Sequence, residues 1–228
     1  NLESTSDKVH INEKAIHDFP FSENISDNLS LIDLKGYGYY IPASNDAVEI
    51  RKQNQTNGDS FGEEHSGDFA LAWINHGKQP KDAQYEYMIQ LNSKAVDTNY
   101  TVLKKDQFAH VVQDKKTGIV AYAVFKACND LPGLVTSCSR PGLIMLKQEE
   151  NKLLMSFCDP DLMTNPGGEI TRYNLNDAPT SPKREVEIKL DGEYNSDDNN
   201  LTISEGKTKL AFSTHNALIE NFEFKVEN

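Results

Sequence analysis

The sequence predicts an all-β protein built from antiparallel β-sandwiches. Its strongest hydrophobic patterns have a period of two residues, and turn-forming residues interrupt them at intervals of about ten positions. Segments with the 3.6-residue period of a helix are nearly absent. These observations favour strands joined by short turns over an alternation of strands and helices.

In the N-terminal third, two apolar segments, residues 31–42 and 69–77, are predicted to be strands. The segment between them, residues 44–67, is rich in Asn, Gln, Asp, Glu, Ser and Gly, which predicts a long loop or insertion. Gly36 and Gly38 precede no helix, so we interpret them as a kink in the first strand rather than as part of a nucleotide-binding loop.

Two consecutive hairpins are predicted in the middle of the chain. Residues 108–113 and 119–125 flank a polar loop that ends in Gly118, and residues 143–146 and 153–157 flank a second polar loop. Consecutive hairpins are typical of a sandwich and do not fit strand–helix–strand units.

The clearest alternation lies near the C-terminus. Residues 185–190 alternate between charged and apolar side chains and end at the turn dipeptide Asp191-Gly192. In residues 221–227, Phe222, Phe224 and Val226 share one face and polar side chains share the other. Both segments are predicted to be strands with one dry and one solvated face.

Composition narrows the function. The 228 residues are 37% hydrophobic and 25% charged, and 23 Lys and Arg against 35 Asp and Glu give a formal net charge of −12. An acidic chain does not neutralise phosphates, so we expect no nucleic-acid partner. No window approaches the run of about 18 apolar residues that spans a bilayer, so we expect no membrane partner.

The most suggestive chemical grouping is His76 with Tyr85 and Tyr87. A histidine and a phenol that are positioned together can share acid and base work. The plainer interpretation, which we favour, is that His76 and Gly77 end a strand in a tight turn. The two tyrosines then lie on one face of the next strand as packing or rim residues.

Metal ligands and disulfides are not indicated clearly. Asp159, Asp161, Asn165 and Glu169 offer oxygen ligands as a calcium loop would, but they lack the ordered spacing of an EF-hand, so a plain acidic turn is favoured. The three cysteines form no CxxC pair and are interpreted as buried or half-buried free thiols. These cysteines are Cys128, Cys138 and Cys158. The sequence leaves open whether two of them form a disulfide.

Residues 72–88 carry the pattern Trp-Ile-Asn-His-Gly-x-x-Pro-x-x-Ala-x-Tyr-x-Tyr. This pattern resembles a motif of polysaccharide lyase family 8, and it looks closest to the chondroitin sulfate ABC lyases. Shorter segments resemble other strands of the same family in the same order; they are residues 9–16, 36–41, 100–106 and 158–162. His10 and Glu13 depart from the family, which more often has Trp and Gly at these positions.

The resemblance implies a domain organisation. Residues 1–98 match the end of the central β-supersandwich of these lyases, and residues 99–228 match their C-terminal β-sandwich. The partners implied are the N-terminal helical catalytic domain and the remainder of the central β-domain of the same enzyme. As a fragment, residues 1–98 should expose an apolar face, because part of a sheet cannot cover both its edge and its face.

The resemblance also implies a chemistry, namely β-elimination at a uronic acid of a glycosaminoglycan such as chondroitin or dermatan sulfate, or hyaluronan. No position of this sequence matches the catalytic cluster, so we assign it no catalytic, substrate-binding or metal-binding residue. A divalent cation, calcium or magnesium, stays open for the parent enzyme, and a bacterial periplasmic or secreted location is expected. The family-motif residues are interpreted as structural, and they are Trp73, His76, Gly77, Pro80, Tyr85 and Tyr87.

The alternative function is a non-catalytic carbohydrate-binding β-sandwich. Such a module needs an exposed aromatic platform, for which the candidates are Trp73 or the group Tyr37, Tyr39 and Tyr40. The net charge of −12 counts against autonomous binding of sulfated chains. A surface adhesin is a third option that rests on analogy of fold alone.

Overall fold

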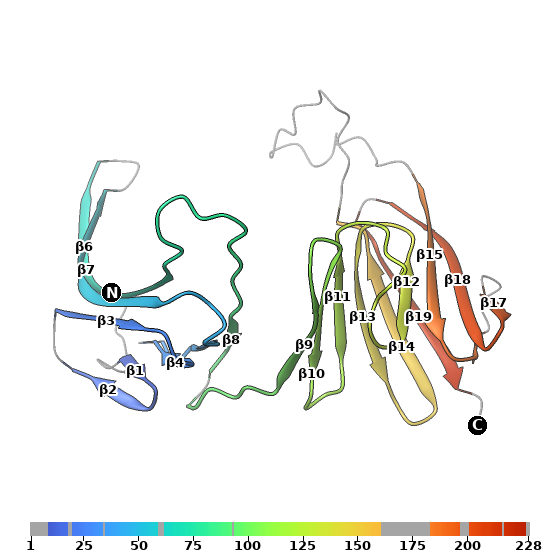
Figure 1. Cartoon of the computed structure of the whole chain (residues 1–228), viewed down its shortest axis with the longest axis horizontal. Helices are drawn as coiled ribbons and strands as arrows, with labels where there is room; N and C mark the ends of the chain where they lie inside the picture. Colours follow the sequence, from blue (N-terminus) through green and yellow to red (C-terminus); the bar gives the residue numbers. More distant parts are fainter. Residues whose placement is uncertain are drawn as a thin grey trace. The chain divides into compact units, whose positions relative to one another are not determined.

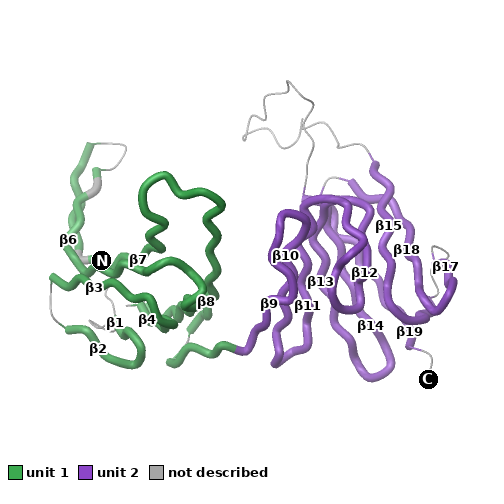
Figure 2. Tube along the Cα trace, in the orientation of Figure 1, with its two compact units in different colours: residues 1–98 green, residues 99–228 purple. Residues whose placement is uncertain are grey.

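The structure, a computed structural model, confirms the all-β prediction (Figure 1). The described part of the chain contains no helix, and therefore none that could span a membrane. The chain divides into two compact units, residues 1–98 (unit 1) and residues 99–228 (unit 2) (Figure 2). The structure describes residues 9–17, 20–33, 35–58, 62–92, 94–160, 183–196, 201–215 and 217–226.

Unit 1 contains two antiparallel sheets. The five-stranded sheet has the order β2 (Lys14–Ile16), β1 (Val9–Ile11), β4 (Leu29–Ile32), β5 (Gly38–Ile41) and β8 (Met88–Gln90). The three-stranded sheet has the order β3 (Phe21–Ile25), β6 (Val48–Gly58) and β7 (Glu64–Ile74).

The core of unit 1 is small and lies between these sheets. From the three-stranded sheet it receives Val48 and Ile50 of β6, which are almost completely buried. The facing side chains come from the five-stranded sheet, and they are Val9, Ile11, Ile16, Leu29, Leu31 and Ile41. Their alternation along each strand follows from the two-residue period of a strand with one buried face.

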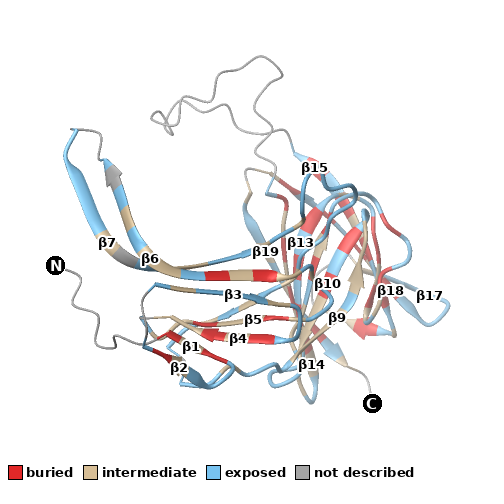
Figure 3. Ribbon diagram, turned by 60° about the vertical axis from the view of Figure 1, so that its left-hand side comes forward, coloured by how far each residue is buried: buried red, intermediate tan, exposed pale blue. Residues whose placement is uncertain are grey.

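Residues 44–67 do not form the predicted loop. Most of them belong to β6 and β7, whose ladder runs without a register shift from Val48↔Ile74 to Gly58↔Glu64. β3 pairs with β6 only as far as Lys52, so beyond that point the hairpin is a two-stranded ribbon. Figure 3 shows buried residues at its base and exposed ones toward its far end. With both faces solvated, the ribbon lacks the hydrophobic alternation by which a strand is recognised in a sequence.

Residues 31–42 are two strands rather than the predicted one. β4 ends at Ile32 and β5 begins at Gly38, and a turn joins them. The carboxylate of Asp33 accepts hydrogen bonds from the backbone N–H groups of Lys35 (2.8 Å) and Tyr37 (2.9 Å). Gly36 has φ +80° there, a conformation that favours glycine. The glycine therefore serves a turn and not a kink within a strand.

Unit 2 is a β-sandwich. Its seven-stranded sheet has the order β16 (Tyr194–Asn195), β19 (Ile219–Val226), β14 (Lys152–Cys158), β13 (Gly142–Gln148), β11 (Val120–Val124), β10 (Ala109–Asp114) and β9 (Tyr100–Lys105). Its four-stranded sheet has the order β12 (Val135–Cys138), β15 (Arg184–Asp191), β18 (Lys207–Thr214) and β17 (Leu201–Ser204).

The predicted hairpins and strands of unit 2 are confirmed. β10 pairs with β11 and β13 pairs with β14, each pair antiparallel and joined by a short polar loop. Alternate residues of β14 and β15 are buried, as the charged and apolar alternation requires. The two sheets meet where Phe157 of β14 contacts Phe212 of β18 edge to face, with ring centroids 5.1 Å apart.

Candidate functional site

A groove of about 550 Å³ in unit 1 gathers most of the motif residues. One wall is the face of the five-stranded sheet, where Leu31, Tyr39 and Ile41 line the groove. The second wall is β7, of which five consecutive residues, 70–74, contribute. Side chains from the segment after β7 complete the lining, and these are His76, Tyr85 and Tyr87.

Trp73, the first residue of the sequence motif, lines the groove from β7. It stands directly opposite Glu49 in the β6–β7 ladder, and the guanidinium carbon of Arg51 lies 5.0 Å from the centroid of its ring. The indole is 37% exposed, so it belongs to the surface and not to the core. A cation over one ring face leaves the remaining indole surface for contact with another molecule.

His76 is held by the turn that precedes β6. Its Nδ1 lies 2.6 Å from Oδ2 of Asp46, and its side chain is about one-quarter exposed. Next to it, the N–H of Gly77 donates to Oδ1 of Asn75 at 2.9 Å, and Gly77 has φ +71°. The positive φ favours glycine at the position after the histidine, and the chain bends at residues 78–79 directly after it.

Asn45 anchors the tyrosine segment. Its side-chain amide accepts a hydrogen bond from the N–H of Glu86 (2.8 Å) and donates one to the C=O of Glu86 (2.7 Å). Tyr85 and Tyr87 flank Glu86, and their rings are stacked with centroids 6.1 Å apart. Both tyrosines lie outside β8 and are more than half exposed, so the prediction that they lie on the next strand is wrong.

The polar part of the groove is acidic. Besides its two backbone contacts, Asp33 accepts a hydrogen bond from the hydroxyl of Tyr39 (3.3 Å) through Oδ2. Burial and the nearby Asp33 carboxylate raise the pKa of Tyr39, so its phenol stays protonated at neutral pH. Among the described residues that line the groove there is no Lys or Arg.

Metal binding finds no support in the described residues, where no group of three or more His, Cys, Asp and Glu side chains is placed to hold an ion. Asp159 of the suggested calcium loop is buried and lies 2.6 Å from Nη1 of Arg184. The other residues of that loop, Asp161, Asn165 and Glu169, lie outside the described residues.

The groove thus brings together Trp73, His76, Tyr85 and Tyr87, whereas Gly77 shapes the turn beside it and Pro80 is exposed. Of the tyrosines offered as an aromatic platform, only Tyr39 is among the described residues that line the groove. The residues that sequence reasoning missed are Asn45 and Asp46, which hold the tyrosine segment and His76. In the sequence, Asn45 and Asp46 stand out only as two adjacent Asx residues in a turn. Such pairs are common, and they do not indicate which distant residues their side chains contact.

Known proteins resemble this chain in sequence and in fold. No family model matches the chain. It is 26% identical to the chondroitin sulfate ABC endolyase of Proteus vulgaris, over 92% of this chain and 21% of that protein. It is 29% identical to a chondroitin sulfate ABC exolyase of Bacteroides thetaiotaomicron, over 70% of this chain and 17% of that protein.

Solved structures show the same fold. A Paenibacillus xanthan lyase has a TM-score of 0.75 and 17% identity, and the match covers 100% of this chain and 23% of that one. A Streptomyces coelicolor A3 chondroitin AC lyase has a TM-score of 0.65 and 13% identity, over 96% of this chain and 29% of that one. The resemblance to chondroitin sulfate ABC lyases is confirmed, and the chain spans about one-fifth of the curated relatives it matches.

Proposed function

We propose that this chain is the C-terminal β-portion of a glycosaminoglycan lyase and that its role there is structural. In this proposal unit 1 is the end of the central β-sandwich and unit 2 is the C-terminal β-sandwich. The similarity to chondroitin sulfate ABC lyases over most of the chain supports the assignment, as does the all-β fold shared with solved polysaccharide lyases.

The parent enzyme would cleave chondroitin or dermatan sulfate, or hyaluronan, by β-elimination at a uronic acid. In that reaction the uronate carboxylate is neutralised, a base removes the adjacent C5 proton, and an acid protonates the leaving glycosidic oxygen. The groove of unit 1 carries a positioned histidine and three phenols, and no Lys or Arg is among its described lining residues. We therefore propose that the catalytic centre belongs to the rest of the parent, with this chain supporting the cleft.

Two further properties of the parent are part of the proposal. Because its substrates are long extracellular polysaccharides, the enzyme would act in the periplasm or outside a bacterial cell. The proposal leaves open a divalent cation, calcium or magnesium, in the parent enzyme and assigns no ligand for it to this chain.

The observation that carries the structural role is the exposed apolar surface of unit 1. Six large hydrophobic side chains there are exposed, and three of them line the groove. They are Phe69, Trp73, Tyr85, Tyr87, Ile89 and Leu91. Of these, Trp73, Tyr85 and Tyr87 come together at the groove, and this cluster is the part of the exposed surface that supports an interaction site.

The experiment is a complementation assay that follows the ultraviolet absorbance of the unsaturated uronate. The chain alone is expected to be inactive on chondroitin sulfate, the N-terminal remainder of the parent alone is expected to be inactive or nearly so, and the two together are expected to be active. Activity of the chain by itself would contradict the proposal, and so would full activity of the remainder without it.

The aromatic groove favours one second candidate, a glycan-binding module. Trp73, Tyr85 and Tyr87 offer ring surfaces on which sugars stack. The acidic lining opposes a sulfated ligand, so binding of a neutral oligosaccharide is the sharper test. In that case Trp73→Ala should abolish binding measured by titration calorimetry while the melting temperature stays unchanged.

A further inference from the structure

We propose that the free edge of β7 is the docking site for one extended strand from the part of the parent protein outside this chain. The inference rests on the proposed function. In the three-stranded sheet β7 has β6 as its neighbour on one side and no strand of the described residues on the other. The last five residues of β7, 70–74, are all apolar and include no proline. Edge strands without charge, proline or bulge are templates for pairing with another strand.

The backbone groups that point to this edge can be identified. The N–H of Asn75 donates to the C=O of Ala47 (2.9 Å), on the side of β6. Because the ladder has no register shift and antiparallel residues alternate, Trp73 and Leu71 also direct their backbone groups toward β6. The N–H and C=O groups of Ala70, Ala72 and Ile74 therefore point away from β6, toward the free edge.

The groove runs along the same edge. Side chains of successive strand residues point to opposite faces, so a cavity lined by all of residues 70–74 touches both faces and the backbone edge between them. Ala72 faces the five-stranded sheet beside its ladder partner Ile50, yet Ala72 is exposed whereas Ile50 is buried. The three-stranded sheet therefore stops covering the five-stranded sheet at β7.

The two sheets of unit 1 differ in their number of strands, which agrees with a missing neighbour of β7. Three strands face a sheet of five, and the opposite wall of the groove is formed by Leu31 and Ile41, which are buried, and Tyr39, which is half-buried. Neighbouring strands lie about 4.8 Å apart, so a strand paired with β7 would pass over these residues. It would satisfy the edge backbone groups and also cover the exposed Ala72.

A strand of the parent fits this site better than other occupants. The matched relatives have about four-fifths of their length outside the aligned region, so chain is available to supply a strand. A sulfated glycan would meet the Asp33 carboxylate in a groove whose described lining includes no Lys or Arg, and the nearby Arg51 guanidinium already lies over the ring of Trp73.

Hydrogen exchange tests the inference without a mutation. The amides of Ala70, Ala72 and Ile74 are expected to exchange rapidly in the isolated chain and at least roughly 100-fold more slowly in the full parent protein. The amides of Leu71 and Trp73 point to β6 and serve as internal controls that are protected in both. Equally fast exchange of the three edge amides in the full parent would overturn the inference.

A matched pair of variants gives a second measurement in the complementation assay. Ala72→Pro removes an edge N–H without removing a bond to β6 and is expected to weaken association at least tenfold, whereas Ala72→Ser keeps the N–H and should change it less than twofold. If Ala72→Pro lowers the melting temperature of the isolated chain, weaker association could come from lost stability. In that case the hydrogen-exchange measurement decides whether a strand docks at the edge of β7.

The possible outcomes separate this inference from the proposed function. Failure of the wild-type chain to complement defeats the proposed function itself. Complementation by both variants alike, together with fast edge amides in the parent, defeats only the docking of a strand. Protection of the edge amides in the isolated chain by a neutral oligosaccharide, or by a concentration-dependent dimer, would assign the edge to that occupant and also overturn the inference.

Discussion

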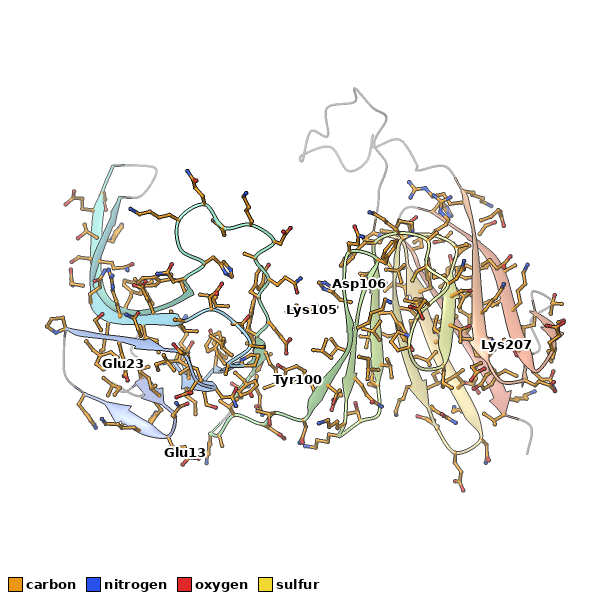
Figure 4. All side chains as sticks on the ribbon, in the orientation of Figure 1. Glu13, Glu23, Tyr100, Lys105, Asp106 and Lys207 are labelled. Carbon is orange, nitrogen blue, oxygen red and sulfur yellow. The ribbon has the colours of Figure 1, made fainter. Side chains whose placement is uncertain are left out.

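At the scale of single residues, Glu13 stands where the resembling family more often has glycine. Asn12 and Glu13 form the two-residue turn between β1 and β2 with φ +48° and +68°, and Figure 4 labels Glu13 in this turn. Left-handed backbone costs a non-glycine residue about 1–2 kcal/mol. Glu13→Gly should therefore raise the free energy of unfolding of unit 1, by roughly 0.5–1 kcal/mol after the extra chain entropy of glycine is counted.

Urea denaturation of the purified chain measures this change. Ala15→Gly is the matched control, because Ala15 is the middle residue of β2 and glycine weakens the interior of a strand. If backbone strain at Glu13 is the cause, Glu13→Gly should raise the free energy of unfolding and the control variant should lower it. A loss of stability in both variants would contradict this prediction.

Gly142 is required by close packing and not by its backbone conformation. A Cβ at this position would lie 2.5 Å from two ring carbons of Phe157, whose side chain is fully buried and cannot move aside. Gly142→Ala should destabilise unit 2 by about 1–3 kcal/mol, as overpacking of a core does. Gly58→Ala, which meets only one atom at 3.9 Å, should change stability little in the same thermal melt.

Cys128 and Cys138 face each other across an antiparallel bridge, and each N–H donates to the other C=O at 2.9 Å. Such hydrogen-bonded pairs have Cα atoms about 5.5 Å apart, within the range of a disulfide. We expect diamide to oxidise this pair, with loss of one hydrogen from each thiol, and to leave Cys158 free. Burial raises the pKa of Cys138, so the rate should increase with pH as the thiolate forms.

Peptide mapping by mass spectrometry identifies the oxidised cysteines. Cys128→Ser should abolish the intramolecular product. A disulfide that includes Cys158 would show that the bridge does not set the pairing.

At the scale of elements, the turn between β9 and β10 depends on a charged carboxylate. Asp106 accepts hydrogen bonds from the N–H groups of Phe108 (2.7 Å) and Ala109 (2.9 Å), and Figure 4 labels it beside Lys105 at the end of β9. The two backbone donors and Lys104 lower its pKa below the ordinary value of 3.8. A lowered folded-state pKa stabilises the fold above the unfolded-state pKa, and this contribution is lost as the pH falls through the folded-state pKa.

Asp106→Asn should accordingly be less stable than the wild type at neutral pH, and the difference should close as the pH falls below 3.8. Chemical denaturation at a series of pH values measures it. A difference that does not depend on pH would mean that the hydrogen-bond geometry matters and the charge does not.

The strands of unit 2 could be predicted because each has one buried face, as Phe222, Phe224 and the residues of β15 illustrate. The ribbon of β6 and β7 could not be predicted from the sequence. It is held by hydrogen bonds between backbone groups, and these do not require an alternation of polar and apolar side chains. In the groove, the aromatic members of the motif were recognised in advance. Asn45 and Asp46 were not, because their partners lie 41 and 30 residues away in sequence.

At the scale of the whole molecule, the two units differ in the size of their cores. Among the described residues, twenty buried hydrophobic side chains form the core of unit 2 and eight form that of unit 1. Because buried apolar area drives folding, unit 1 should unfold at a lower urea concentration than unit 2. Hydrogen exchange as a function of urea resolves the two units, and a single transition that includes both would contradict this expectation.

The two-stranded ribbon of β6 and β7 has a consequence for the fidelity of its pairing. Shifting one strand by two residues would return every side chain to the face it occupied, and beyond Lys52 neither face is packed, so no burial would be lost. The correct alignment of the far half is therefore set at the base, where Ile50 and Val48 are locked into the core opposite Ala72 and Ile74. A substitution at Val48 or Ile50 would not only weaken the core but also allow misaligned forms of a hairpin tip that lies far from it.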